Sequence, residues 1–172
     1  MANVISYRTD KEEQLKKFAK QRSITLSQLT SDIVNHYLEF YELSTKLDMV
    51  RDTKKTISVC FELLDDDDLT KIGEIDTVEV IQSFKMMIND FSFEKLSELV
   101  RSWFRFSNYD LEEFDEDTHV KFVSKNKMSR NWNFHQANVF VQIYQHFGFS
   151  GSVESTEENL LVFKISKKQE QK

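Results

Sequence analysis

Residues 4–29 read VISYRTDKEEQLKKFAKQRSITLSQL, and this stretch decides the fold at the start of the chain. Its first six residues alternate between two faces, which is typical of a β-strand, and the next segment carries Leu15, Phe18 and Ala19 at helical spacing. A longer helix begins at Thr25. A lone strand is paired most simply by the same strand of a second copy, antiparallel across a two-fold axis. The stretch therefore predicts an obligate dimer that presents a two-stranded ribbon.

This order of strand, helix and helix resembles the ribbon-helix-helix family of DNA-binding proteins, over roughly the first quarter of the chain. Residues 5–10 match the strand, and residues 15–29 match the first helix, the turn and the start of the second helix. The resemblance implies that the paired strands lie in the DNA major groove. It also implies that the side chains of Ile5, Tyr7 and Thr9 point into the dimer core. The side chains of Val4, Ser6 and Arg8 would then point toward base edges.

Among these residues, Arg8 is the strongest candidate for reading bases. Its guanidinium group can bind guanine O6 and N7 with two hydrogen bonds, which gives about 1–3 kcal/mol of discrimination. The free amide groups at the start of the second helix would bind a DNA phosphate, with Lys11, Thr25 and Ser27 as the phosphate-binding side chains. Ser23 occupies the turn position with positive φ where the family usually has Gly, a departure that costs about 1 kcal/mol.

The second helix has a wide apolar surface. One stripe comprises Leu26, Leu29, Ile33, Tyr37 and Phe40, and a second stripe beside it comprises Val34, Leu38 and Tyr41. So much apolar surface on a short module must be buried on more than one side. An intertwined dimer would bury it.

The charge is distributed unevenly along the chain. Residues 1–23 contain six basic against three acidic side chains, whereas the whole chain has a net charge of −6 and a pI near 5.3. An acidic bulk disfavours nonspecific coating of DNA and suits a protein that contacts DNA through one face. It equally suits a dimer that binds no DNA and holds another protein.

Composition and length limit the class of protein. The chain is 40% hydrophobic and 13% aromatic, which is ample for a core beyond the first module. No run of 18 apolar residues and no signal-peptide pattern occurs, so we expect a soluble, cytoplasmic protein without a membrane partner. The single Cys60 excludes an intrachain disulfide.

We expect four parts: a ribbon-helix-helix module at 1–45, a connection at 46–55, an α+β domain at 56–166 and a polar tail at 167–172. Helices should come first in the α+β domain. The first expected helix is capped by Thr56 or Ser58 and ends at Leu64, and the second is started by the Asp65–Asp68 run. A third follows Asp76-Thr77, and a fourth, capped by Ser92, covers residues 93–106. The third helix should turn its apolar side chains inward, namely Val80, Ile81, Phe84, Met87 and Ile88.

A ββαββ arrangement should follow these helices. The expected elements are strands at 109–114 and 118–124, a helix at 129–147 ended by Gly148, and strands at 151–155 and 160–166. They predict a four-stranded antiparallel sheet packed on the long helix, hence an α+β fold. This part resembles an uncharacterised prokaryotic domain found behind ribbon-helix-helix modules. It keeps Trp132 but lacks the His and Gly expected shortly before it, so no residue role is carried over.

Residues suited to catalysis are few. Of the histidines, His135 and His146 are too far apart on one helix to share a metal ion, since eleven residues span about 16 Å. A composite site of Cys60 with a distant His stays open, and the Asp65–Asp68 run is better explained as a helix start than as a calcium loop. We expect no enzyme, no catalytic residue, no metal site and no cofactor.

The aromatic helix at 129–147 allows two interpretations. Trp132, Phe134, Phe140 and Tyr144 could surround an apolar effector, or they could form core, which we favour. The sequence thus predicts a homodimeric, sequence-specific DNA-binding protein, a transcriptional regulator bound to double-stranded DNA, with a C-terminal domain for effector sensing or oligomerisation. The alternative is a protein-interaction module, an antitoxin-like or scaffold dimer, whose C-terminal domain binds a protein partner.

Overall fold

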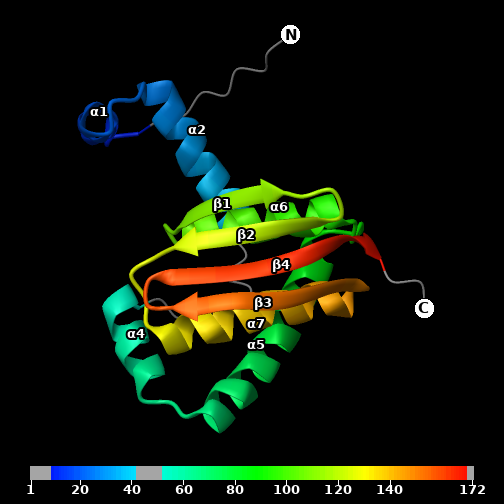
Figure 1. Cartoon of the computed structure of the whole chain (residues 1–172). Coiled ribbons are helices and arrows are strands. Elements are labelled where there is room, and N and C mark those ends of the chain that lie inside the picture. Colours follow the sequence, from blue (N-terminus) through cyan, green and yellow to red (C-terminus); the bar gives the residue numbers. More distant parts are fainter. Residues whose placement is uncertain (1–8, 42–51, 170–172) are drawn as a thin grey trace. The chain divides into compact units, whose positions relative to one another are not determined.

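The chain divides into two compact units, Met1–Asp48 (unit 1) and Met49–Lys172 (unit 2). The computed structural model describes residues 9–41 and 52–169 (Figure 1). Most of the predicted strand therefore lies outside the described residues, including Val4, Ser6 and Arg8. Most of the predicted connection at 46–55 lies outside them as well.

Unit 1 consists of two helices joined by a short turn. Helix α1 spans Glu12–Gln21 and α2 spans Leu26–His36, and α2 continues into a π-helical segment, η1, at Tyr37–Tyr41. The two predicted helices and their turn are thus present. Within the described residues of this unit, only Ala19 and Leu29 are buried hydrophobics.

Unit 2 begins with three helices, α4 (Lys54–Glu62), α5 (Asp66–Met87) and α6 (Phe93–Phe106). The expected cap of α4 at Thr56 or Ser58 is wrong. Thr53 is the N-cap, since its backbone is extended and its Oγ1 accepts a hydrogen bond from the Thr56 amide at 3.2 Å. The Thr56 hydroxyl lies 2.9 Å from the same oxygen, so Thr56 belongs to the first turn.

The Asp65–Asp68 run does start a helix, with Asp65 Oδ1 accepting from the Asp68 amide at 2.9 Å. The expected break at Asp76-Thr77 is wrong, because α5 runs through it as one helix of 22 residues. Both polar side chains there are used in tertiary contacts: Asp76 accepts from His135 Nε2 at 2.9 Å, and Thr77 Oγ1 donates to Gln142 at 3.1 Å. Polar side chains that are hydrogen-bonded to another helix need not end the helix that carries them.

The second half of unit 2 is the predicted ββαββ arrangement. Strands β1 (Asp110–Asp115) and β2 (His119–Lys125) precede α7 (Arg130–His146), and β3 (Phe149–Glu157) and β4 (Leu160–Gln169) follow it. All pairs are antiparallel in the order β1-β2-β4-β3, which confirms the α+β class and the four-stranded antiparallel sheet (Figure 1). Gly148, which follows the C-cap residue Phe147 of α7, has φ 90°, as predicted for a left-handed cap.

The predicted polar tail at 167–172 is wrong for its first three residues, since β4 extends to Gln169. The Lys167 amide donates to the Thr118 carbonyl at 2.9 Å, so the strand gains a partner just before β2. Charged residues are compatible with a strand whose side chains alternate toward solvent. Residues 170–172 lie outside the described part.

One face of the sheet forms the core together with α6 and α7. Phe122 and Phe163 stack there with ring centroids 4.8 Å apart, and Phe140 and Tyr144 of α7 are 2% and 0% exposed against them. This confirms the core interpretation for Phe140 and Tyr144, whereas Phe134 is exposed. Among the described residues, no helix has the length and apolar character that a membrane span needs.

Candidate nucleic-acid interface

The turn between α1 and α2 has the geometry expected of a tight helix–helix connection. Ser23 has φ 55°, the Ser23 amide donates to the Lys20 carbonyl at 3.1 Å, and the Ile24 amide donates to the Ala19 carbonyl at 3.0 Å. These two bonds form a Schellman motif, which ends α1 and reverses the chain. The backbone at position 23 therefore has the left-handed conformation that was predicted there, although the residue is serine and not glycine.

Thr25 and Ser27 lie together at the start of α2. Thr25 is the N-cap with an extended backbone, and its Oγ1 accepts from the Gln28 amide at 3.1 Å. Ser27 is exposed in the first turn. The amide groups of this turn have no carbonyl partner within their own helix, so the end of α2 carries a partial positive charge and is suited to an anion such as phosphate.

Lys11 lies elsewhere, at the N-cap of α1. Its ammonium group is 3.2 Å from Asp10, and its amide donates to Thr9 Oγ1 at 3.0 Å. Within the described residues, no hydrogen bond or ion pair joins Lys11 to Thr25 or Ser27. Of the three predicted phosphate-binding residues, the structure thus brings two together.

The remaining basic residues of unit 1 fall into two groups. Lys16 bridges Glu12 and Glu13 at 2.8 and 3.0 Å, and these carboxylates raise its pKa. Lys17, Lys20 and Arg22 are exposed and have no ion pair among the described residues. The sequence alone indicates only their contribution to the net charge of residues 1–23, whereas their positions near the end of α1 make them candidates for phosphate contacts.

The apolar face of α2 and η1 is not covered by the described residues of unit 1. Leu29 is buried, but Leu38 is 61% and Tyr37 is 53% exposed, and Ile33, Val34 and Tyr41 are exposed as well. The rings of Tyr37 and Tyr41 stack at 5.5 Å. Both predicted stripes therefore include large exposed apolar side chains.

In unit 2, a buried histidine and a half-buried asparagine of α7 are bound to structural partners. His135 is fully buried and bonds Asp76, and the Asn131 amide donates to the carbonyl groups of Phe61 and Leu64 at 3.0 and 3.1 Å. These contacts fix α4 and α5 against α7. Cys60 is exposed, and the described residues contain no group of three His, Cys, Asp or Glu side chains arranged to hold a metal ion.

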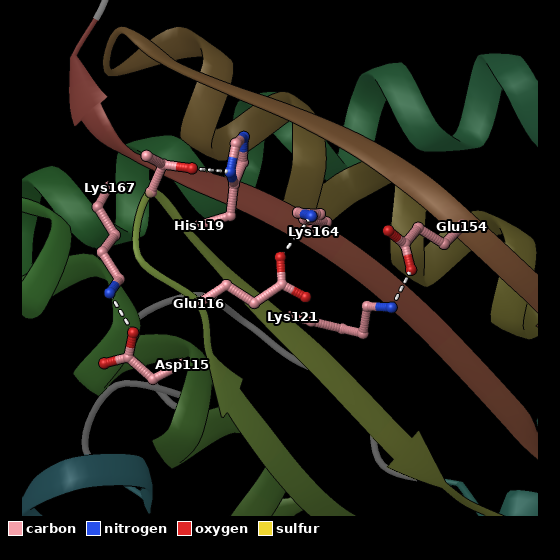
Figure 2. Close-up of polar contacts among 8 residues, drawn as sticks. Asp115, Glu116, His119, Lys121, Glu154, Lys164 and Lys167 are labelled. Carbon is pink, nitrogen blue, oxygen red and sulfur yellow. Dashed lines mark hydrogen bonds and ion pairs between the residues drawn. The ribbon is translucent and has the colours of Figure 1, made fainter.

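Ion pairs join neighbouring segments of the sheet (Figure 2). On its open face, Lys121 of β2 lies 2.7 Å from Glu154, and Lys164 of β4 lies 2.6 Å from Glu116. Lys167 follows the core side of β4, as Ile165 does, and pairs with Asp115. The ammonium group of Lys164 lowers the pKa of Glu116. Because each of these three lysines has its own carboxylate, they leave little charge for a ligand.

No known protein-family model matches the chain, and no curated protein matches it.

Proposed function

We propose that the chain is a homodimeric ribbon-helix-helix protein that binds double-stranded DNA in a sequence-specific manner and regulates transcription. In this proposal residues 4–9 of two chains form the ribbon, with Val4, Ser6 and Arg8 toward base edges. Thr25, Ser27 and the free amide groups of α2 hold a phosphate on each side. Lys11 approaches the DNA backbone from the start of α1.

The uncovered apolar face of α2 and η1 carries this proposal. With Ala19 and Leu29 as its only buried hydrophobics in the described part, unit 1 has too little core to be stable alone. A second copy of the same helix would cover the exposed side chains across a two-fold axis. The Schellman turn at Ser23 and the capped start of α2 support the same arrangement, because they set two helices directly after the alternating segment.

Dimer formation can be tested with a matched pair of variants. Leu38→Glu places a charge on the exposed apolar face of unit 1, whereas Leu63→Glu does so at a leucine of unit 2 that is 81% exposed. We expect Leu38→Glu to shift the chain toward monomer in sedimentation equilibrium, because a buried unpaired carboxylate opposes association. Leu63→Glu should stay dimeric, and equal behaviour of the two variants would argue against this interface.

DNA reading is tested by selecting the purified protein against random duplex DNA at about 0.15 M salt, where backbone binding alone is weakened. We expect a short palindrome to be enriched, since a two-fold dimer reads two half-sites. Arg8→Ala should abolish the preference and leave the dimer intact, while Arg105→Ala, at an exposed arginine of α6, should change neither. Unchanged affinity of Arg8→Ala for the selected site would contradict the assignment.

One observation favours a second candidate, a dimer that binds another protein and no specific DNA. Helix α5 exposes Ile75, Val78 and Met86 at 62%, 53% and 63%. Apolar side chains gathered on one helix are a common feature of protein-binding surfaces. A stoichiometric partner that is lost on Ile75→Glu, together with no enriched DNA sequence, would favour this candidate.

A further inference from the structure

A hollow of about 640 Å³ lies in unit 2 where four segments meet. These are the start of α4, the residues around the start of β1, the residues that end and follow β2, and the turn between β3 and β4. Three lysines line it, Lys54, Lys125 and Lys127, and Asp110 is its one lining carboxylate. All the lining residues are polar or charged, and the volume falls in the range of small-molecule sites.

The lysines of this hollow are less well neutralised than those of the open sheet face. Lys54 donates to the Asn108 carbonyl at 2.7 Å and lies 3.9 Å from the centre of the Tyr109 ring. Lys125 lies 3.5 Å from Glu112, a long contact between exposed groups. Lys127 has no carboxylate partner among the described residues.

The positive charges also act on one another. Burial and the nearby Lys127 ammonium group lower the pKa of Lys54, whereas the Asp110 carboxylate acts to raise it. Lys54 is in addition the first residue of α4, so the hollow lies beside the positive end of that helix. An anion placed between these groups would relieve their repulsion.

Hydrogen bonds hold the loop that carries Lys127. The Asn126 side chain donates to Asn133 Oδ1 at 2.8 Å and accepts from the Met128 amide at 3.0 Å. The Asn126 amide donates to the Asn159 carbonyl at 3.0 Å, which ties this loop to the turn between β3 and β4. Because Asn133 is fully buried, the loop is anchored to the core of α7. The lysines are therefore presented on a preorganised frame, which reduces the entropy lost on binding.

We propose that this hollow binds a small phosphorylated ligand, with Lys54, Lys125 and Lys127 contacting the phosphate oxygens and the asparagines contacting its polar remainder. A compact ligand fits better than a nucleic-acid strand, because Asp110 lines the hollow and Glu112, Glu157 and Glu158 follow in the adjoining strands and turn. A long polyanion would meet these carboxylates, whereas a single phosphate group avoids them. The proposal rests on unit 2 alone and does not require DNA binding.

The test is calorimetric titration of the full-length chain with pyrophosphate at about 0.15 M salt. We expect one saturable site per chain. Lys127→Ala should weaken binding roughly tenfold, since a hydrogen bond between charged groups is lost. Lys71→Ala, at an exposed lysine of α5 outside the hollow, should bind like the unaltered chain. Lys127 is exposed and unpaired within the described residues, so this variant should fold, and unchanged tryptophan emission would verify that.

Three results would overturn the proposal. The first is no saturable binding up to about 10 mM pyrophosphate, and the second is equal affinities of Lys127→Ala and Lys71→Ala. The third is displacement of pyrophosphate by a short DNA duplex in the Arg8→Ala variant, which would assign the hollow to nucleic-acid phosphates. Pyrophosphate binding that persists in Arg8→Ala and resists duplex DNA supports the proposal, whatever the outcome of the DNA selection.

Discussion

Asn133 shows at the residue scale how a buried polar side chain organises unit 2. It is fully buried in α7, where Nδ2 donates to the Glu157 carbonyl at 2.7 Å and Oδ1 accepts from Asn126. One amide group thus joins the end of β3 to the loop after β2. Buried polar groups that lose such a partner are costly, because water does not replace it.

We expect Asn133→Ala to lower the free energy of unfolding by about 2–3 kcal/mol, since both hydrogen bonds of this fully buried amide group are lost. Asn138→Ala is the matched control on the same helix. The Asn138 amide donates only to the Phe134 carbonyl within its own helix, so we expect little change. Urea denaturation would measure both, and similar losses would contradict this role for Asn133.

Two tyrosines make stability depend on pH in the alkaline range. Burial raises the pKa of Tyr144, whose hydroxyl lies 2.8 Å from buried Ser97, and it raises the pKa of Tyr109 to about 12. The pKa of such a tyrosine is higher in the folded chain than in the unfolded chain, where it is near 10. Its contribution to stability is therefore complete below about pH 10 and is lost as the pH rises through the pKa of the folded state.

The unfolding equilibrium constant should therefore increase between about pH 10 and pH 12, by up to roughly tenfold per pH unit for a tyrosine that stays protonated when folded. A variant with Tyr109→Phe and Tyr144→Phe should show a shallower increase, although Tyr144→Phe also removes the hydrogen bond to Ser97. Urea titrations at several pH values would measure the slope, and an unchanged slope in the variant would refute this origin.

At the element scale, two glycines of unit 2 have opposite requirements. Gly73 lies inside α5, and a Cβ there would meet His135 Nδ1 at an ordinary 3.7 Å. Gly151 lies in β3, where a Cβ would come within 2.5 Å of Ile165 Cδ1 and 3.1 Å of the Lys164 carbonyl. Gly73→Ala should raise stability by about 1 kcal/mol through helix propensity, and Gly151→Ala should lower it through overpacking. Thermal unfolding would show the two signs.

The turn of unit 1 permits a similar test. Ser23→Gly removes the strain of a non-glycine residue at φ 55° and should stabilise unit 1 by about 0.5–1 kcal/mol. Ser27→Gly, in the first turn of α2, should destabilise it by a similar amount. Circular dichroism at fixed protein concentration would compare them, and a loss of stability in Ser23→Gly would contradict the Schellman assignment.

The sequence predicted elements wherever a local signal and the tertiary structure agree. Gly148 and Ser129 bound α7 because a left-handed residue and a capping hydroxyl act within one turn. The break at Asp76-Thr77 was wrong because His135 and Gln142 come from a distant segment and pair with those side chains. The lysine-lined hollow was missed for the same reason, since its residues come from four separate stretches of the chain.

At the scale of the whole molecule, the two units should unfold separately. Unit 2 contains all the buried hydrophobics of the described residues except Ala19 and Leu29, whereas unit 1 is proposed to depend on a second copy. Both tryptophans, Trp103 and Trp132, belong to unit 2, so tryptophan emission reports that unit alone. We expect the unfolding midpoint seen by tryptophan emission to be independent of protein concentration. Far-ultraviolet circular dichroism should show an additional transition, whose midpoint rises with protein concentration. A single transition seen identically by both probes would contradict this.

The position of β4 also bears on how the chain folds as it is made. This strand is the last of the sheet in chain order, yet it lies between β2 and β3. While the ribosome is still adding residues 160–169, both neighbours lack their central partner, and Phe122 cannot stack on Phe163. Unit 1 leaves the ribosome much earlier. In the proposed dimer, two chains could therefore pair before either sheet closes, and neighbouring ribosomes on one transcript would favour such assembly during translation.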